Sequence, residues 1–232
     1  MDNRPCIVIT GAAQRIGLHC ARRFVDDGYR VIITCRHWRK EWDETPLPGI
    51  EVMLADFSSE EGIHTFIAEL RAAQAILRGF IHNASLWLDD SAPEAFDLMM
   101  RVHVQAPYLI NQALPGLFDV NGTADIIHLT DRVAHVGSAK HIAYCASKAA
   151  LEALTLSFAA RLAPRIKVNS IAPALIMFND GDSPAYRQRT LEKSALGIEP
   201  GPEVVYQSIR YLMDNPYVTG TSLQLDGGRH LK

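Results

Sequence analysis

The sequence has few cysteines, no long apolar run and no strong excess of charge of either sign. Its four cysteines, Cys6, Cys20, Cys35 and Cys145, form neither a CxxC pair nor the spacing of a zinc site. They indicate reduced thiols in a cytoplasmic protein, with no disulfide framework and no metal centre. No apolar stretch approaches the ~18 residues that span a bilayer. We expect no signal peptide, because Pro5 leads directly into an apolar, β-branched run.

The charge and length narrow the class of protein further. A formal net charge of −3 at pH 7 argues against a nucleic acid or an anionic membrane as the main partner. The 232 residues contain no linker, repeat or low-complexity segment, so residues 1–232 are expected to form one well-buried domain.

Short apolar runs alternate with helical patterns along the chain. The runs that predict strands are Cys6–Thr10, Arg30–Cys35, Gly49–Ala55, Gly79–Ala84, Asp125–Thr130, Ile166–Ala172 and Thr221–Leu225. Helices are predicted up to Phe24, over Glu60–Ala73, over Pro93–Phe118 (interrupted by two prolines) and over Tyr144–Leu162. This alternation predicts a doubly wound, Rossmann-type α/β fold, with a parallel sheet covered on both faces.

The first strand is followed by the glycine-rich turn TGAAQRIG, Thr10–Gly17. Gly11 permits a tight turn, and Gly17 lets the following helix pack closely on the sheet. Backbone N–H groups at the start of that helix make a pyrophosphate site. The spacing is not the standard GxGxxG, since Arg15 stands where a middle glycine is expected. Its guanidinium could bind a phosphate oxygen or a substrate carbonyl.

The second strand ends in the basic run Arg36–Lys40. NAD-preferring Rossmann proteins usually carry an acidic residue here for the ribose hydroxyl, so a basic tip favours a 2′-phosphate and therefore NADP(H). Arg36 is the best single candidate, and a solvated basic loop is the alternative. Asp56, at the end of the third strand, is placed to accept a hydrogen bond from an adenine amine.

Tyr144 and Lys148 lie four positions apart in a predicted helix, so both side chains project from one face. A nearby ammonium favours the phenolate and is expected to lower the pKa of the tyrosine, which then donates a proton near neutrality. Asp131, thirteen positions earlier, is expected at the end of the preceding strand. The alternative is an amphipathic helix with a surface lysine.

Five segments together resemble the short-chain dehydrogenase/reductase family over essentially the whole chain. They are the turn Thr10–Gly17, His82–Ser85 (HNAS), Tyr144–Lys148 (YCASK), Val168–Pro173 (VNSIAP) and Leu225–Gly228 (LDGG). The resemblance implies about seven parallel strands, an NAD(P)(H) cofactor, tyrosine as the proton donor, lysine on the nicotinamide ribose, and commonly a homotetramer. The cofactor-binding residues that it implies are Gly11, Arg15, Ile16, Gly17, Arg36, His37, Asp56, Phe57, Asn83, Ala84, Tyr144, Lys148, Pro173 and Ile176.

One departure from the family pattern bears on the substrate. Where the family has a serine that hydrogen-bonds a substrate carbonyl, this sequence has Asp131. A carboxylate of ordinary pKa is ionised at pH 7 and only accepts hydrogen bonds, so it repels the oxyanion that develops from a ketone. It favours a substrate with N–H groups or a ring imine that is being protonated. Ordinary carbonyl reduction is thereby disfavoured.

Asp131, Arg15 and HNAS in place of NNAG together resemble the pteridine reductase branch of the family. Trp87 matches an aromatic residue that stacks on the pterin, and core packing is the alternative for it. The substrate-binding residues that the resemblance implies are Arg15, Ser85, Trp87, Asp131 and Tyr144. It implies NADPH-dependent reduction of 7,8-dihydromonapterin, and more weakly of 7,8-dihydrofolate, to the tetrahydro form.

Two rival functions stay open: a general carbonyl reductase, acting for instance on a 3-oxoacyl thioester, and a non-catalytic NADPH-binding sensor. The segment Leu175–Leu196 is expected to be a mobile substrate lid. His103 stands where the family often has an asparagine that organises a proton-relay water. A satisfied core histidine is the alternative for that position.

Overall fold

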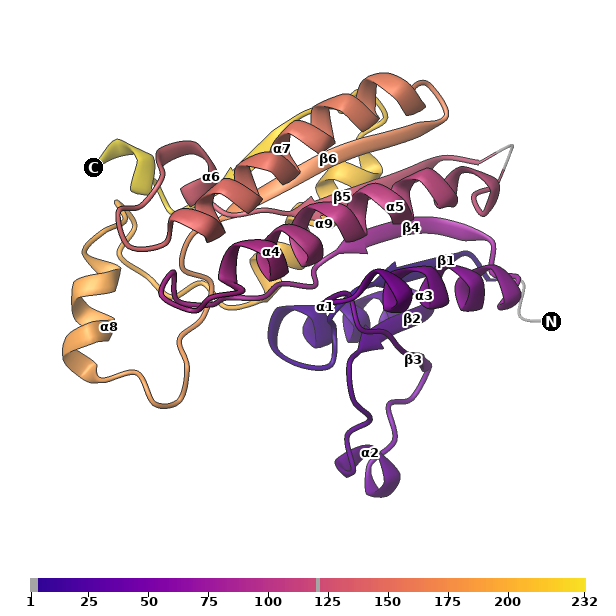
Figure 1. Cartoon of the computed structure of the whole chain (residues 1–232), viewed down its shortest axis with the longest axis horizontal. Helices are drawn as coiled ribbons and strands as arrows, with labels where there is room; N and C mark the ends of the chain where they lie inside the picture. Colours follow the sequence, from indigo (N-terminus) through magenta and orange to yellow (C-terminus); the bar gives the residue numbers. More distant parts are fainter. Residues whose placement is uncertain (1–3, 120–121) are drawn as a thin grey trace.

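The sheet of the computed structural model, which describes residues 4–119 and 122–232, is built from seven parallel strands in the order β3-β2-β1-β4-β5-β6-β7 (Figure 1). The strands are β1 Cys6–Ile9, β2 Arg30–Cys35, β3 Ile50–Leu54, β4 Leu77–His82, β5 Ala124–Leu129, β6 Ile166–Pro173 and β7 Ser222–Leu225. The strand order reverses between β1 and β4. In an open parallel sheet, a crevice forms at such a reversal, outside the carboxyl ends of the strands. The predicted Rossmann-type fold is confirmed.

Helices cover both faces of the sheet. They are α1 Arg15–Asp26, α2 Glu41–Glu44, α3 Glu60–Ala72, α4 Ala95–Met100, α5 Ala106–Ala113, α6 Val133–Val136, α7 Ile142–Leu162, α8 Pro184–Leu191 and α9 Glu203–Asp214. One core lies between the sheet and α3, α5 and α7, and a second lies between the sheet and α1 and α9. Figure 1 shows α3, α5 and α7 on the near side of the sheet.

Strand β1 shows why the apolar runs form central strands. All four of its residues are fully buried, with Cys6 and Val8 in one core and Ile7 and Ile9 in the other. A parallel strand that is covered on both faces needs a continuous apolar run rather than an alternating one. No helix in the described ranges, 4–119 and 122–232, is both long and apolar enough to cross a membrane.

The helix predicted over Pro93–Phe118 is interrupted. Between α4 and α5 the backbone forms a π-helical turn, Arg101–Gln105, and after α5 a 3₁₀ turn, Leu114–Gly116. Pro107 has no N–H to donate to the carbonyl of residue 103, and the helix widens to i→i+5 bonding just before it. The interruptions expected at the two prolines, Pro107 and Pro115, are confirmed, and the π turn carries the buried His103.

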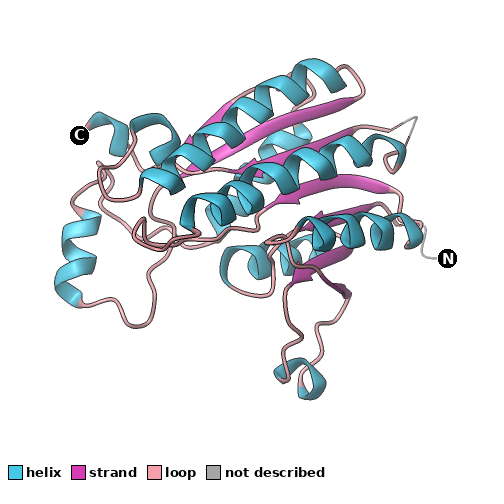
Figure 2. Cartoon of the chain, viewed as in Figure 1, coloured by secondary structure: helices cyan, strands magenta, loops and turns pink. Residues whose placement is uncertain are grey.

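The expected lid segment consists of extended chain followed by α8. The side chain of Ser183 accepts a hydrogen bond from the backbone N–H of Tyr186, and Pro184 occupies the first turn. Helix α8 projects from one end of the molecule, where Figure 2 shows that the long loops also gather.

Candidate active site

The glycine turn after β1 packs closely against neighbouring backbone because two of its positions lack a side chain. Gly11 has a φ of +61°, and a Cβ there would lie 2.7 Å from the Cα of Ala84. A Cβ on Gly17 would lie 2.6 Å from the Cα of Ala12. Both predicted roles, the tight turn and the close packing of the helix, agree with this geometry.

The loop after β4 holds this turn in place. The side-chain amide of Asn83 donates to the carbonyls of Thr10 (3.0 Å) and Gly11 (2.9 Å). The hydroxyl of Thr10 in turn accepts from the backbone N–H groups of Asn83 and Ala84, each at 3.0 Å. Asn83 and Ala84 therefore shape the turn. The first turn of α1 has neither a side-chain cap nor an acidic residue, which suits an anion at its N-terminus.

Arg15 begins α1 with a φ of +53°, which is uncommon for a residue with a side chain. Its guanidinium donates to the Oδ1 of Asn179 at 2.7 Å and to the carbonyl of Met177 at 3.2 Å. Both partners belong to the expected lid segment. In this structure Arg15 therefore links the glycine turn to that segment.

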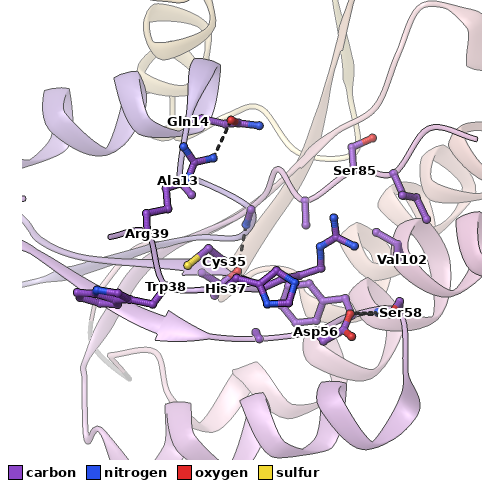
Figure 3. A pocket seen from close by; sticks show the side chains of 17 residues that line it. Ala13, Gln14, Cys35, His37, Trp38, Arg39, Asp56, Ser58, Ser85 and Val102 are labelled. Atoms are coloured by element: carbon purple, nitrogen blue, oxygen red, sulfur yellow. Dashed lines mark hydrogen bonds between the residues drawn. The ribbon is translucent and has the colours of Figure 1, made fainter. Parts of the chain in front are cut away.

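A cavity of about 330 Å³ lies beside the turn at the ends of β2 and β3 (Figure 3). The side chain of Asp56 accepts hydrogen bonds from the hydroxyl (2.7 Å) and the backbone N–H (2.9 Å) of Ser58. These bonds, aided by the charges of Arg36 and His37, hold the pKa of Asp56 below its ordinary value. The predicted 2′-phosphate and adenine-binding residues line this one cavity.

Two arginines of the basic run differ in the hydrogen bonds and ion pairs that their side chains make. Arg39 donates to Gln14 at 2.7 Å and to Glu41 at 3.3 Å. Arg36 is exposed and makes no hydrogen bond or ion pair with any residue in the described part of the chain. Arg36 lines the cavity and is thus available to a phosphate bound there.

At the other side of the crevice, the hydroxyl of Tyr144 donates to the Oδ2 of Asp131 at 3.1 Å. Lys148 is 2 % exposed, and its Nζ donates to the carbonyl of Leu129 at 3.0 Å. Burial, and then the Asp131 carboxylate, raise the pKa of Tyr144 above its ordinary value. Burial lowers the pKa of Lys148 to about 8, against the opposing effect of Asp131 and Glu152.

The expected lowering of the tyrosine pKa by the lysine was therefore wrong for this structure. The carboxylate that accepts the hydrogen bond of Tyr144 stabilises the protonated phenol, and burial disfavours the phenolate as well. The two side chains do share one helix face as predicted, with the Lys148 Nζ 5.6 Å from the centroid of the Tyr144 ring.

His103 is a satisfied core residue, which decides between the two interpretations of that position. It is 1 % exposed, and its Nε2 accepts from the backbone N–H of Leu86 at 3.0 Å. The proton must then sit on Nδ1, which donates to the hydroxyl of Ser147 at 2.8 Å. Burial lowers the pKa of His103 to about 2. The histidine joins the loop after β4 to helix α7, and the Oγ of Ser85 lies 3.0 Å from the same Nε2.

Trp87 lies in the loop after β4 and is 55 % exposed. Its ring meets only the edge of His141 among the described aromatic side chains, at 5.3 Å between centroids. The alternative of core packing is therefore wrong, and the indole is free to stack on a planar ligand.

Three apolar residues among the predicted cofactor contacts belong to or pack on the hydrophobic cores: Phe57, Ile176 and Ile16. Phe57 and Ile176 are 6 % and 4 % exposed, and the Phe57 ring packs edge-on against Phe66 in the core. Ile16 packs partly buried on the second core, and the carbonyl of Pro173 accepts from the N–H of residue 132. Phe57 and Ile176 can meet a cofactor mainly through their backbone.

Ser147 and Glu152 belong to the hydrogen-bond network of the site but were not predicted from the sequence. The carboxylate of Glu152 accepts hydrogen bonds from the hydroxyls of Thr130, Ser170 (2.6 Å) and Ser222 (3.0 Å), next to or on three neighbouring strands. Its position four residues after Lys148, on the same face of α7, was the available signal.

Comparison with known proteins gives consistent relatives. Residues 11–230 match a family model described as enoyl-(acyl carrier protein) reductase. The chain is 47 % identical over 240 residues to dihydromonapterin reductase of Klebsiella pneumoniae subsp. pneumoniae, and 46 % identical over 232 residues to that of Escherichia coli O6:K15:H31. Each match covers 97 % of both chains.

A solved structure has the same fold. It is FolM alternative dihydrofolate reductase 1 from Brucella canis complexed with NADP, which has a TM-score of 0.88 and 24 % identity, covering 100 % of this chain and 96 % of that one. The chain combines the YCASK helix, the glycine turn and a seven-stranded parallel sheet, and its sequence relatives match over 97 % of its length. The chain belongs to the short-chain dehydrogenase/reductase family.

Proposed function

We propose that this chain is an NADPH-dependent reductase of 7,8-dihydropterins, with 7,8-dihydromonapterin as its favoured substrate and 7,8-dihydrofolate as a weaker one. The observation that carries the proposal is the carboxylate of Asp131, hydrogen-bonded to Tyr144 where the family has a neutral hydroxyl. The names of the relatives at 47 % and 46 % identity support it.

The residues present fit a dinucleotide. The uncapped start of α1, without an acidic residue in its first turn, suits a pyrophosphate, and Gly11 and Gly17 allow the tight packing of the turn that leads into it. Arg36 is free to pair with a 2′-phosphate, and Asp56 keeps one carboxylate oxygen for the adenine amine. NADPH bound there supplies the hydride.

The substrate-binding residues are assigned on the same geometry. Asp131 accepts hydrogen bonds from N–H groups on the polar edge of the pterin, and the exposed indole of Trp87 stacks on its ring. Arg15 and the hydroxyl of Ser85 contact the same edge. Stacking and edge contacts together hold the reacting carbon at hydride distance.

Tyr144 holds the proton that the adjacent ring nitrogen receives. Burial and Asp131 raise the pKa of Tyr144, so the phenol is protonated at neutral pH. Once the N–H groups of the substrate occupy Asp131, the phenol loses its acceptor, and Lys148 on the same helix face stabilises the phenolate that forms. The product is a tetrahydropterin.

The test is Asp131→Ser, assayed with dihydromonapterin and with simple ketones in the presence of NADPH. Loss of a hydrogen bond to a charged acceptor is expected to lower kcat/KM for dihydromonapterin about 10- to 100-fold. Asp26→Ser, at an exposed carboxylate on α1, is the control. A rise in ketone turnover with no loss on the pterin would point instead to a carbonyl reductase.

The sensor alternative predicts NADPH binding without oxidation of NADPH by any dihydropterin. Tyr144 and Lys148 are both present and in contact, which favours the enzyme. From the family resemblance we further propose a homotetramer located in the cytoplasm. Light scattering of the purified protein tests the tetramer.

A further inference from the structure

A second cavity lies between α8 and the C-terminal segment. It has a volume of about 170 Å³, and its apolar walls are Leu175, Leu196, Ile198, Pro200, Val204 and Leu225. A neighbouring cavity of about 240 Å³ contains Asp131. The two share Ala174, Leu175, Thr190 and Arg229 as lining residues, so they adjoin.

Two polar groups in this space are not satisfied within the described residues. Thr190 is 8 % exposed, and its hydroxyl has no hydrogen-bond partner there. A buried hydroxyl without a partner costs stability, which a ligand that bonds to it recovers. Thr190 therefore marks a place where a polar atom of a ligand fits between apolar walls.

Arg229 is the second such group. Its guanidinium makes no hydrogen bond or ion pair in the described part of the chain. The neighbouring carboxylate of Asp226 faces other partners, since it lies 3.6 Å from the Nε of Arg132 and 3.0 Å from the Nδ1 of His230. One unpaired positive charge is left at the junction of the two cavities.

We infer that this space, here named the tail subsite, binds the substituent on C6 of the dihydropterin, and that Arg229 pairs with the carboxylate of those substituents that carry one. The inference rests on the proposed function. Apolar walls suit an aromatic ring, the hydroxyl of Thr190 suits an amide, and a guanidinium suits a carboxylate. The aminobenzoyl-glutamate tail of dihydrofolate has all three features, whereas the short hydroxylated chain of dihydromonapterin has no charge for Arg229.

Two side chains at the mouth fit this assignment. Leu196 and Ile198 line the cavity and yet are 67 % and 55 % exposed. A bound aryl group removes such apolar surface from water, which is favourable in proportion to the area covered.

The test compares two substrates in Arg229→Gln. Loss of the charged contact is expected to lower kcat/KM for dihydrofolate about 10-fold or more, chiefly through KM, and to change kcat/KM for dihydromonapterin less than about 2-fold. Thr190→Val is expected to show the same preference with a smaller loss. Lys232→Gln is the matched control, because this cation bonds the carbonyl of Glu192 outside the cavity.

Equal losses on both substrates, or no loss on dihydrofolate, would overturn the assignment. Calorimetry with p-aminobenzoyl-glutamate and the NADPH-loaded protein gives a second readout that does not need turnover. Weaker binding to Arg229→Gln than to wild type supports the tail subsite, and equal affinity contradicts it. Failure of the wild type to oxidise NADPH with dihydromonapterin refutes the proposed function instead, so the two failures are distinguishable.

Discussion

Acid is expected to destabilise this fold strongly, because three histidines are buried without charge. His82, His103 and His128 are 4 %, 1 % and 0 % exposed. Burial lowers the pKa of His82 to about 4 and that of His103 to about 2, and it lowers the pKa of His128 well below its ordinary value.

For His128 and His103, the hydrogen bonds explain why the buried imidazole does not accept a second proton. The side-chain amide of Asn111 donates to the Nε2 of His128 at 3.0 Å, and the Nδ1 of His128 bonds the hydroxyl of Thr155 at 2.8 Å. The Oδ1 of the same Asn111 accepts from the Nε2 of His82 at 2.8 Å. His103 likewise accepts from a backbone N–H. Protonation of His128 or His103 would set two donors against each other in the core, whereas burial is what lowers the pKa of His82.

The magnitude follows from proton uptake. An unfolded histidine has a pKa near 6.5, so below that pH the unfolded chain binds one more proton per buried histidine than the folded chain does. The stabilisation is complete above pH 6.5 and is lost as the pH falls toward the folded values. Each histidine contributes ~1.4 kcal/mol per pH unit, and the three together about 4 kcal/mol per unit. Against a typical stability of about 5–15 kcal/mol, one pH unit is a large fraction.

Urea unfolding followed by circular dichroism, at pH steps between 7.5 and 4.5, measures this slope. His128→Gln, which keeps a hydrogen-bonding side chain but does not titrate, is expected to reduce the slope from about three protons to about two. His64→Gln, at an exposed position on α3, is the control. A wild-type slope of one proton or fewer, or the same slope in His128→Gln as in wild type, would refute the reasoning.

Two further predictions concern the site. Arg36→Gln should weaken the preference for NADPH over NADH about 10- to 100-fold in kcat/KM, because it removes the free cation at the end of β2, while Lys40→Gln should change it little. An unchanged preference in Arg36→Gln would place the phosphate elsewhere. Glu152→Gln removes a charge that raises the pKa of Lys148, so the limb of the pH profile that reports this lysine should move to lower pH, by about one unit. A shift to higher pH would contradict that assignment.

The strands could be predicted because burial on both faces leaves a direct signature. A run such as Cys6–Ile9, with every residue apolar, has few other places in a parallel α/β fold. The ends were less certain: β4 begins at Leu77 and ends at His82, two residues before both predicted limits. Hydrogen bonding to neighbouring strands decides where a ladder stops, and that depends on segments distant in the sequence.

The sequence predicted which residues lie together in the site better than it predicted how their charges and hydrogen bonds shift the pKa values. Spacing placed Tyr144 and Lys148 on one helix face, but it did not specify whether the hydroxyl would bond the lysine or Asp131. The sign of the tyrosine pKa shift depends on that choice. Thr190 and Arg229 line one cavity because α8 lies against the C-terminal segment. No local sequence pattern indicates that packing.

The balance of charge at Asp131 relates substrate choice to proton transfer. In the pattern of the family, a neutral serine leaves the lysine as the only charge beside the tyrosine, which favours the phenolate. Here the carboxylate offsets the cation and accepts the hydrogen bond of Tyr144, so the phenol keeps its proton. A ketone brings no N–H donor, so we expect this bond to stay intact and the phenol to keep its proton with a ketone bound. A dihydropterin offers N–H groups to Asp131, and we expect the tyrosine to become acidic only with such a substrate in place.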